Sequence, residues 1–125
     1  MPTGSVIGTS SIRRRSQILS FRKDLKIKLL RGNVDTRIQK LEEGEYDAIV
    51  LSYAGLIRLQ KDHLISDLFP INEFLPASCQ GAVGIQIANN NEDAELLRSL
   101  RKMNHYQTEL TCSTEREVLK SINAN

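Results

Sequence analysis

The chain has 125 residues, 40% of them hydrophobic and 26% charged, with a formal net charge of +2. Such a length and composition are typical of one soluble globular domain, or of one domain with attached segments. No apolar run approaches the roughly 20 residues of a membrane-spanning helix, and the first residues lack the basic and apolar regions of a secretory signal. We therefore expect a cytoplasmic protein that contacts no membrane.

The charges are unevenly distributed along the chain. Residues 1–40 hold ten Lys and Arg against two Asp and Glu, whereas residues 41–125 hold seven against thirteen. A solvated charged face is the ordinary meaning of such a run, but a basic N-terminal third also favours binding of an anion. The acidic remainder, and the lack of aromatic residues interleaved with the basic ones, argue against a nucleic-acid-binding module.

Residues 5–59 alternate strand-like and helix-like segments. Short apolar runs predict strands, and apolar residues at helical spacing after a Ser or Asn cap predict helices. We expect three strand–helix pairs. Strands are predicted at 5–8, 25–30 and 46–52, and the helices that follow them are predicted at 11–23, 33–43 and 53–59. In the first of these helices Ile12 and Leu19 are predicted to face inward, and in the second Ile38 is.

Short connections between these segments predict an α/β fold with a mostly parallel sheet flanked by helices. In such sheets, ligands bind beyond the carboxyl ends of the strands. Arginines follow each predicted strand, and we expect their side chains to converge on that edge. They are Arg13 and Arg14 after the first strand, Arg31 after the second, Arg37 one helical turn further on, and Arg58 after the third.

The stretch "GTSSIRRRSQ" (8–17) predicts an anion site. Backbone N–H groups at a helix start favour anions, and Thr9, Ser10 and Ser11 add hydroxyl donors. An anion bound there would offset the repulsion between the positive helix end and the arginines. The planar guanidinium suits carboxylate or phosphate, because it makes two parallel hydrogen bonds.

Each of these assignments has a structural alternative. Arg13 and Arg14 fit surface arginines that follow a cap, and Arg31 and Arg37 fit salt bridges with Asp35 or Glu42. Arg58 also fits an ordinary amphipathic helix. Further candidates for ligand contact are Gly32, which follows Arg31, and the pair Gln80 and Gly81, which equally fit a plain turn.

The second half of the chain adds a predicted strand at Val83–Ile87 and helices at 89–104 and 105–122. Cys79 and Cys112 lie far apart without metal-ligand spacing, so we expect no metal site and two reduced thiols, with a disulfide as the alternative. No phosphate-binding glycine motif occurs. The two histidines are too isolated to suggest a catalytic triad. The residues alone predict a domain that binds a compact polyanion, without a general acid or a nucleophile.

Three long motifs resemble the porphobilinogen deaminase family, also called hydroxymethylbilane synthases. They are "GTSSIRRRSQ", "LLRGNVDTRIQKLEEGEYDAIVLSYAGLIRL" and "LPASCQGAVGIQI", and the match continues through "NHYQTELTCSTERE". The resemblance implies a transferase of tetrapyrrole (haem) biosynthesis that joins four porphobilinogen units into hydroxymethylbilane and releases ammonia. The product grows on a dipyrromethane cofactor attached to a cysteine.

By this resemblance, the predicted site residues bind carboxylates of the cofactor, the substrate and the growing polypyrrole chain. Ser11, Arg13 and Arg14 would bind acids of the cofactor and the chain. Arg31, Arg37 and Arg58 would hold substrate or growing-chain acids, and Gln80 with Gly81 would line the same cleft. Arg15 occupies a position that the family motif leaves variable, so it receives no role.

The resemblance also implies parts that lie outside this chain. The family's catalytic aspartate belongs to a preceding domain, and its cofactor-bearing cysteine would follow directly after Asn125. Residues 1–81 would form most of the second domain, a lobe resembling a type II periplasmic binding protein. Residues 82–104 would return to the first domain and residues 105–125 would begin the third.

We therefore expect an internal fragment that holds no catalytic residue, binds no dipyrromethane and does not turn over alone. The resemblance implies a monomeric family, whereas residues 82–125, which would lack their packing partners, are expected to self-associate with another copy or to be mobile. The alternative function is a non-catalytic anion-binding domain of the periplasmic-binding type, because a fold does not fix a function.

Overall fold

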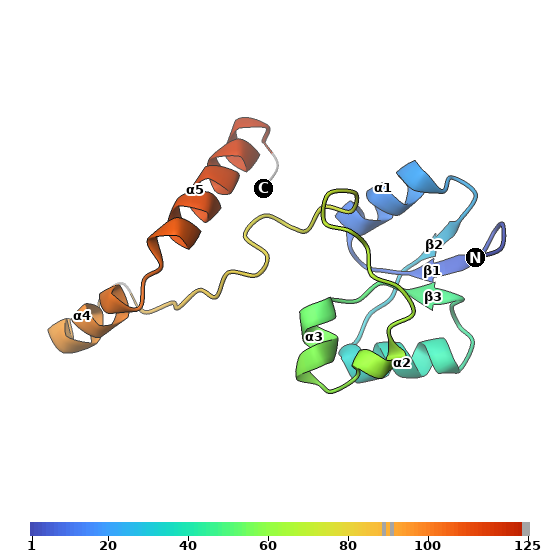
Figure 1. Ribbon diagram of the computed structural model, residues 1–125, viewed down its shortest axis with the longest axis horizontal. Coiled ribbons are helices and arrows are strands. Elements are labelled where there is room, and N and C mark those ends of the chain that lie inside the picture. The colour runs from blue at the N-terminus through green and yellow to red at the C-terminus, as the bar shows by residue number, and fades with distance from the viewer. Residues whose placement is uncertain (89, 91, 124–125) are drawn as a thin grey trace. The chain divides into compact units, whose positions relative to one another are not determined.

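The computed structural model describes residues 1–88, 90 and 92–123. The chain divides into two compact units, Met1–Leu75 and Pro76–Asn125, and each is described by itself. Figure 1 shows that the first unit contains the sheet, whereas the described elements of the second unit are helices. The expected domain assignment stays a prediction. It gives residues 1–81 to the second domain, residues 82–104 to the first and residues 105–125 to the third.

A three-stranded parallel sheet forms the centre of the first unit. The strands are β1 (Val6–Gly8), β2 (Lys26–Lys28) and β3 (Ala48–Ile49), in the order β2-β1-β3. Ile7 of β1 lies opposite Ile27 on one side and Ala48 on the other. All three strands fall inside the predicted segments, and β3 is much shorter than the apolar run 46–52 suggested.

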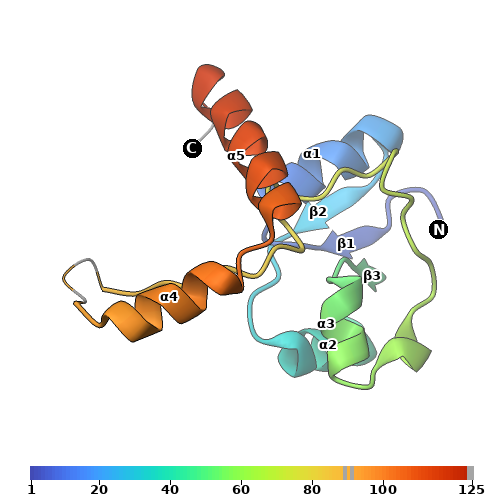
Figure 2. The same cartoon turned by 60° about the vertical axis from the view of Figure 1, so that its left-hand side comes forward.

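Helices cover both faces of the sheet. In Figure 1 and Figure 2, α1 (Ile12–Phe21) lies on one face, while α2 (Val34–Glu42) and α3 (Tyr53–Arg58) lie on the opposite face. A single 3₁₀ turn, η1 (Asp62–Leu64), follows α3. The strands β2 and β3 lie on opposite sides of β1. The connection that leaves β1 therefore runs to one side of it, and the connection that leaves β2 crosses back to the other side, which makes a topological switch point at β1. The predicted α/β class is confirmed, and the likeness to a periplasmic-binding lobe stays a prediction.

Each helix of the sheet unit begins at a side-chain cap. Ser11 accepts a hydrogen bond from the backbone N–H of Arg14, and Asn33 accepts one from that of Thr36. At the start of α3, Ser52 accepts a hydrogen bond from the backbone N–H of Gly55. Such caps satisfy N–H groups that have no partner within the helix. Since every cap follows a strand directly, all three helix starts lie at the carboxyl edge of the sheet.

The core of the first unit is formed by Ile7, Ile18 and Phe74. Leu30, two residues after the end of β2, is fully buried. The inward orientation predicted for Ile12 is wrong, because its side chain is 82% exposed. Ile12 is the first residue of α1 and therefore lies beyond the strand ends. Ile18, more than one turn later, is the residue of α1 that becomes buried.

Gly8 ends β1 at a point where Tyr46 packs closely. A Cβ on Gly8 would meet Cδ1 of Tyr46 at 2.8 Å and Cγ2 of Ile49 at 3.0 Å. The buried Tyr46 donates its hydroxyl to the carbonyl of Leu29 at 2.8 Å, and the Lys28 ammonium lies 4.7 Å from its ring centre. These contacts fix the ring, so only glycine fits at the end of β1.

The second unit contains α4 (Ala94–Lys102) and α5 (Tyr106–Ser121). Asp93 caps α4, and His105 caps α5. The helix predicted from residue 89 begins later than expected, and residues 89 and 91 lie outside the described part of the chain. The strand predicted at Val83–Ile87 is wrong. Val83 is 86% exposed, and no described strand pairs with this segment, so its hydrogen-bonding groups have no ladder to join.

We predict that Gly8→Ala destabilises the protein by about 1–3 kcal/mol, because the added methyl overpacks the site against Tyr46. Gly55→Ala is the matched control. Its Cβ would meet Ser52 at an ordinary 3.6 Å, and it should stabilise α3 by roughly 0.5–1 kcal/mol. Urea unfolding measures both values. Equal midpoints for Gly8→Ala and the unchanged protein would contradict the close packing.

Arg22, which follows α1, holds Asp24 through two hydrogen bonds of 2.7 and 2.6 Å. These bonds lower the pKa of the Asp24 carboxyl from 3.8 to about 2. The lowered pKa favours the folded state above about pH 4, and this contribution is lost as the pH falls through about 2. We predict that Arg22→Gln moves the titration midpoint of Asp24, followed by NMR, back towards 3.8. An unchanged midpoint would show that the pair does not persist in solution.

Candidate anion-binding site

Arg14 connects α1 to the end of β3. Its Nη1 donates a 2.7 Å hydrogen bond to the carbonyl of Val50, the residue directly after β3. The bond therefore crosses the switch point between β1 and β3, where open α/β sheets place their ligands. The side chain is partly buried there, so a positive charge is held at the carboxyl edge of the sheet with reduced access to water.

Two further arginines act on this charge. Burial lowers the pKa of Arg14, and repulsion from Arg13 and Arg37 lowers it further. The Arg14 guanidinium nevertheless stays protonated at neutral pH. Arg13 and Arg14 come from α1, and Arg37 comes from α2 on the opposite face of the sheet. The structure thus brings together three of the five arginines that the sequence predicted to converge.

No carboxylate within residues 1–75, all of which the structure describes, forms an ion pair with this cluster. The ion pairs of that unit are Arg22–Asp24, Lys28–Glu45 and Lys61–Asp35. Asp35, a possible salt-bridge partner of Arg31 or Arg37, is thus bound to Lys61 at 2.8 Å. The cluster of like charges favours a ligand that supplies the missing negative charge.

Backbone carbonyls orient the other two guanidinium groups. Arg13 donates through Nη1 to the carbonyl of Leu75, and Arg37 donates through Nε to that of Gly32 at 2.7 Å. Each contact uses one of the five N–H donors of a guanidinium. Gly32 has a φ of +121°, and a Cβ there would come within 2.8 Å of Thr36. Glycine is therefore needed at the turn that anchors Arg37.

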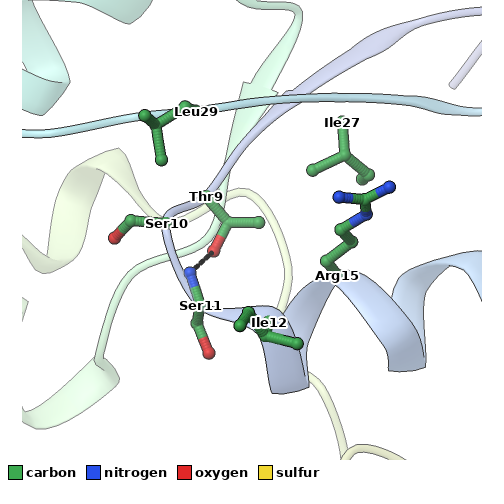
Figure 3. Close-up of a pocket in the computed structure, with 7 residues that line it drawn as sticks. All are labelled: Thr9, Ser10, Ser11, Ile12, Arg15, Ile27 and Leu29. Carbon is green, nitrogen blue, oxygen red and sulfur yellow. Dashed lines mark hydrogen bonds between the residues drawn. The ribbon is translucent and has the colours of Figure 1, made fainter.

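A pocket of about 270 Å³ lies beside the start of α1 (Figure 3). Thr9 is buried, and its Oγ1 accepts a 3.2 Å hydrogen bond from the N–H of Ser11, so it shapes the turn. The remaining lining combines hydroxyl, basic and apolar groups. The residues around the pocket are Thr9, Ser10, Ser11, Ile12, Arg15, Ile27 and Leu29.

Sequence reasoning missed four of the lining residues, which are Ile12, Arg15, Ile27 and Leu29. In Figure 3 the guanidinium of Arg15 lies beside Ile27. Two patterns in the sequence, one along β2 and one along α1, could have predicted these lining residues. Ile27 and Leu29 alternate along β2 and its extension, and therefore share a face. Arg15 stands three residues after Ile12, so the two share a face of α1.

The remaining predicted arginines are less closely tied to the cluster. Arg31 is exposed in the connection between β2 and α2, at the carboxyl edge of the sheet. Arg58 is exposed in the last turn of α3. Their approach to a ligand held by Arg14 stays a prediction.

Gln80 and Gly81 belong to the second unit and form a turn. The Gln80 side chain accepts a 3.0 Å hydrogen bond from the N–H of Ala77, and its own N–H donates to the carbonyl of Ala77. Gly81 has a φ of +102°. These features are those of a turn, and contact of either residue with a ligand stays a prediction.

In the described part of the chain, no helix is long and apolar enough to cross a bilayer. Within the same residues, no group of three or more His, Cys, Asp and Glu side chains could hold a metal ion.

The parallel sheet, the capped helix starts and the arginine cluster at the carboxyl edge define an α/β domain with a candidate anion-binding site. A family model described as "Porphobilinogen deaminase, dipyromethane cofactor binding domain" matches residues 1–96. The chain is also 48% identical over 123 residues to the porphobilinogen deaminase of Geobacillus kaustophilus (strain HTA426). It belongs to the porphobilinogen deaminase family, as its motifs indicated.

That alignment covers 98% of this chain but 39% of the Geobacillus protein. The chain thus spans about two fifths of the length of this relative. The match to the family model, over residues 1–96, includes the entire sheet unit and all five predicted arginines.

We predict that a multivalent carboxylate such as citrate raises the melting temperature, because it binds the arginine cluster in the folded state only. The increase should shrink in Arg14→Gln and in Arg37→Gln, and also with added salt, which screens exposed charges. Arg98→Gln on α4 is the control and should keep the full increase. Differential scanning fluorimetry measures these shifts. An equal shift in all variants would place the anion elsewhere.

Proposed function

We propose that this chain is the carboxylate-binding lobe of a porphobilinogen deaminase (hydroxymethylbilane synthase). The observation that carries the proposal is the partly buried Arg14, repelled by Arg13 and Arg37 and bound to no carboxylate within residues 1–75. Porphobilinogen and the polypyrrole chain built from it carry acetate and propionate side chains. Guanidinium groups bind such carboxylates through paired, charge-assisted hydrogen bonds.

In this proposal, the whole protein joins four porphobilinogen units and releases one ammonia at each step. Arg13 and Arg14 hold acids of the cofactor and of the growing chain, since both lie at the carboxyl ends of β1 and β3. Arg37 binds substrate or growing-chain acids from the opposite helix layer, and Arg31 and Arg58 extend the same positive edge. Ser11, whose hydroxyl oxygen caps α1, can also donate its hydroxyl proton to the same acids.

The residues of the arginine cluster also fit the dipyrromethane cofactor implied by the family. Dipyrromethane carries several carboxylates, and the cluster offers several like charges without a counter-ion of their own. When bound, this cofactor supplies the covalent primer on which the product grows. Arg13, Arg14 and Ser11 are the residues proposed to hold it.

The isolated chain is proposed to bind carboxylates without turnover. The support is its coverage of 39% of the Geobacillus enzyme, together with the lack of a nucleophile or a general acid among the arginine-site residues. The arginine site contributes by positioning the acid groups of the substrate. The remaining catalytic groups are assigned to parts of the protein beyond residues 1–125.

A chimaera tests the proposal directly. The matching segment of the Geobacillus kaustophilus porphobilinogen deaminase is replaced by this chain, and turnover of porphobilinogen is followed through the absorbance of uroporphyrin. The chimaera should be active. Arg14→Gln in the chimaera should lower kcat/KM by roughly 10- to 100-fold, because a hydrogen bond to a charged group is lost. Arg98→Gln should leave kcat/KM unchanged.

The isolated chain supplies the complementary measurement. Porphobilinogen should raise its melting temperature, and no uroporphyrin should form. Sustained turnover by the isolated chain would refute the proposed dependence on other segments. A folded but inactive chimaera that binds small anions better than porphobilinogen would favour the non-catalytic anion-binding alternative.

A further inference from the structure

The second unit brings together two thiols that are 33 positions apart in the sequence. The Sγ of Cys79 lies 3.5 Å from the carbonyl oxygen of Cys112, which is on α5. Both cysteines are free thiols and are partly buried. Each thiol also shifts the pKa of the other, in agreement with this proximity. This proximity is independent of the arginine site.

The backbone at Cys79 is held in an unusual conformation. Its φ of +58° lies in the left-handed region, which is unfavourable for a residue with a Cβ. The N–H of Cys79 donates a 2.6 Å hydrogen bond to the carboxylate of Glu115. Glu115 stands three residues after Cys112 and therefore shares its face of α5. The helix that carries one thiol thus fixes the strained backbone that carries the other.

The two thiols differ in acidity. A hydrogen bond with Ser78, whose Oγ lies 3.5 Å from the sulfur, lowers the pKa of Cys79, with further lowering from Cys112 and Arg116. Burial raises the pKa of Cys112, and the neighbouring sulfur raises it further. The thiolate is the reactive form of cysteine. Cys79 is therefore the attacking group, and Cys112 is placed to attack it in turn.

We propose that Cys79 and Cys112 form a redox-active pair, which closes to an intrachain disulfide on reaction with a low-molecular-weight disulfide such as oxidised glutathione. The Cys79 thiolate attacks one sulfur of oxidised glutathione, breaks its S–S bond and releases one glutathione thiolate. Cys112 then loses its proton, attacks the Cys79 sulfur and releases the second glutathione thiolate. Two protein thiols are oxidised to one disulfide, and one glutathione disulfide is reduced to two thiols.

Closure would tie the turn at residues 77–82 covalently to α5. Both lie in one compact unit, so the reaction requires no second molecule of the protein. The proposal concerns a modification site outside the arginine cluster and does not depend on the proposed enzymatic function.

The reduced chain is incubated with oxidised glutathione, its remaining thiols are alkylated, and the peptides are mapped by mass spectrometry. We expect a Cys79–Cys112 cross-linked peptide from monomeric protein, which dithiothreitol removes. Cys112→Ser should accumulate a stable glutathione adduct on Cys79. Cys79→Ser should form an adduct on Cys112 severalfold more slowly.

Ser78→Ala tests the assignment of the attacking thiol, since loss of the hydroxyl should slow adduct formation on Cys79 severalfold. Cys79→Gly removes the thiol while suiting the left-handed backbone, and circular dichroism of each variant checks that the helices remain. Equal rates at the two cysteines would overturn the assignment. In the unchanged protein, a stable mixed disulfide or a disulfide-linked dimer in place of the intrachain bond would overturn the pair itself.

Discussion

The hydrogen bond from Arg14 to the carbonyl of Val50 is the interaction on which the arginine site depends. It holds a guanidinium against the carboxyl end of β3, where burial and two neighbouring arginines both disfavour its charge. A buried charge is costly unless hydrogen bonds or an opposite charge compensate it. The Val50 carbonyl supplies part of that compensation, and a bound carboxylate would supply the rest.

The order of the strands explains why arginines from different helices meet. β1 lies between β2 and β3, so α1 and α2 cover opposite faces although both begin at the same edge. Arg14 reaches that edge from α1 and Arg37 reaches it from α2. A ligand at that edge would meet guanidinium groups from two layers, which would suit several separated acids better than a single small anion. The polypyrrole chain proposed as ligand has that character.

Much of the first unit could be predicted because its signals are local. Ser11, Asn33 and Ser52 cap helices through hydrogen bonds to residues three positions away, and such spacing is visible in a sequence. Val83–Ile87 was predicted wrongly as a strand, because strand formation requires a partner that the apolar run itself does not reveal. Arg13, Arg14 and Arg37 could be grouped from the predicted topology alone. The proximity of Cys79 to Cys112 could not, since it depends on how a turn packs against a helix.

The packing of Tyr46 against Gly8 has a consequence for how this family can change. The ring occupies the space that any side chain at position 8 would need, and its hydroxyl is fixed by the Leu29 carbonyl. A larger residue at position 8 would need more room from Tyr46 and also from its other close neighbours, Ile49 and Leu30. Among related sequences, position 8 should therefore change only together with these neighbours, through coupled replacements.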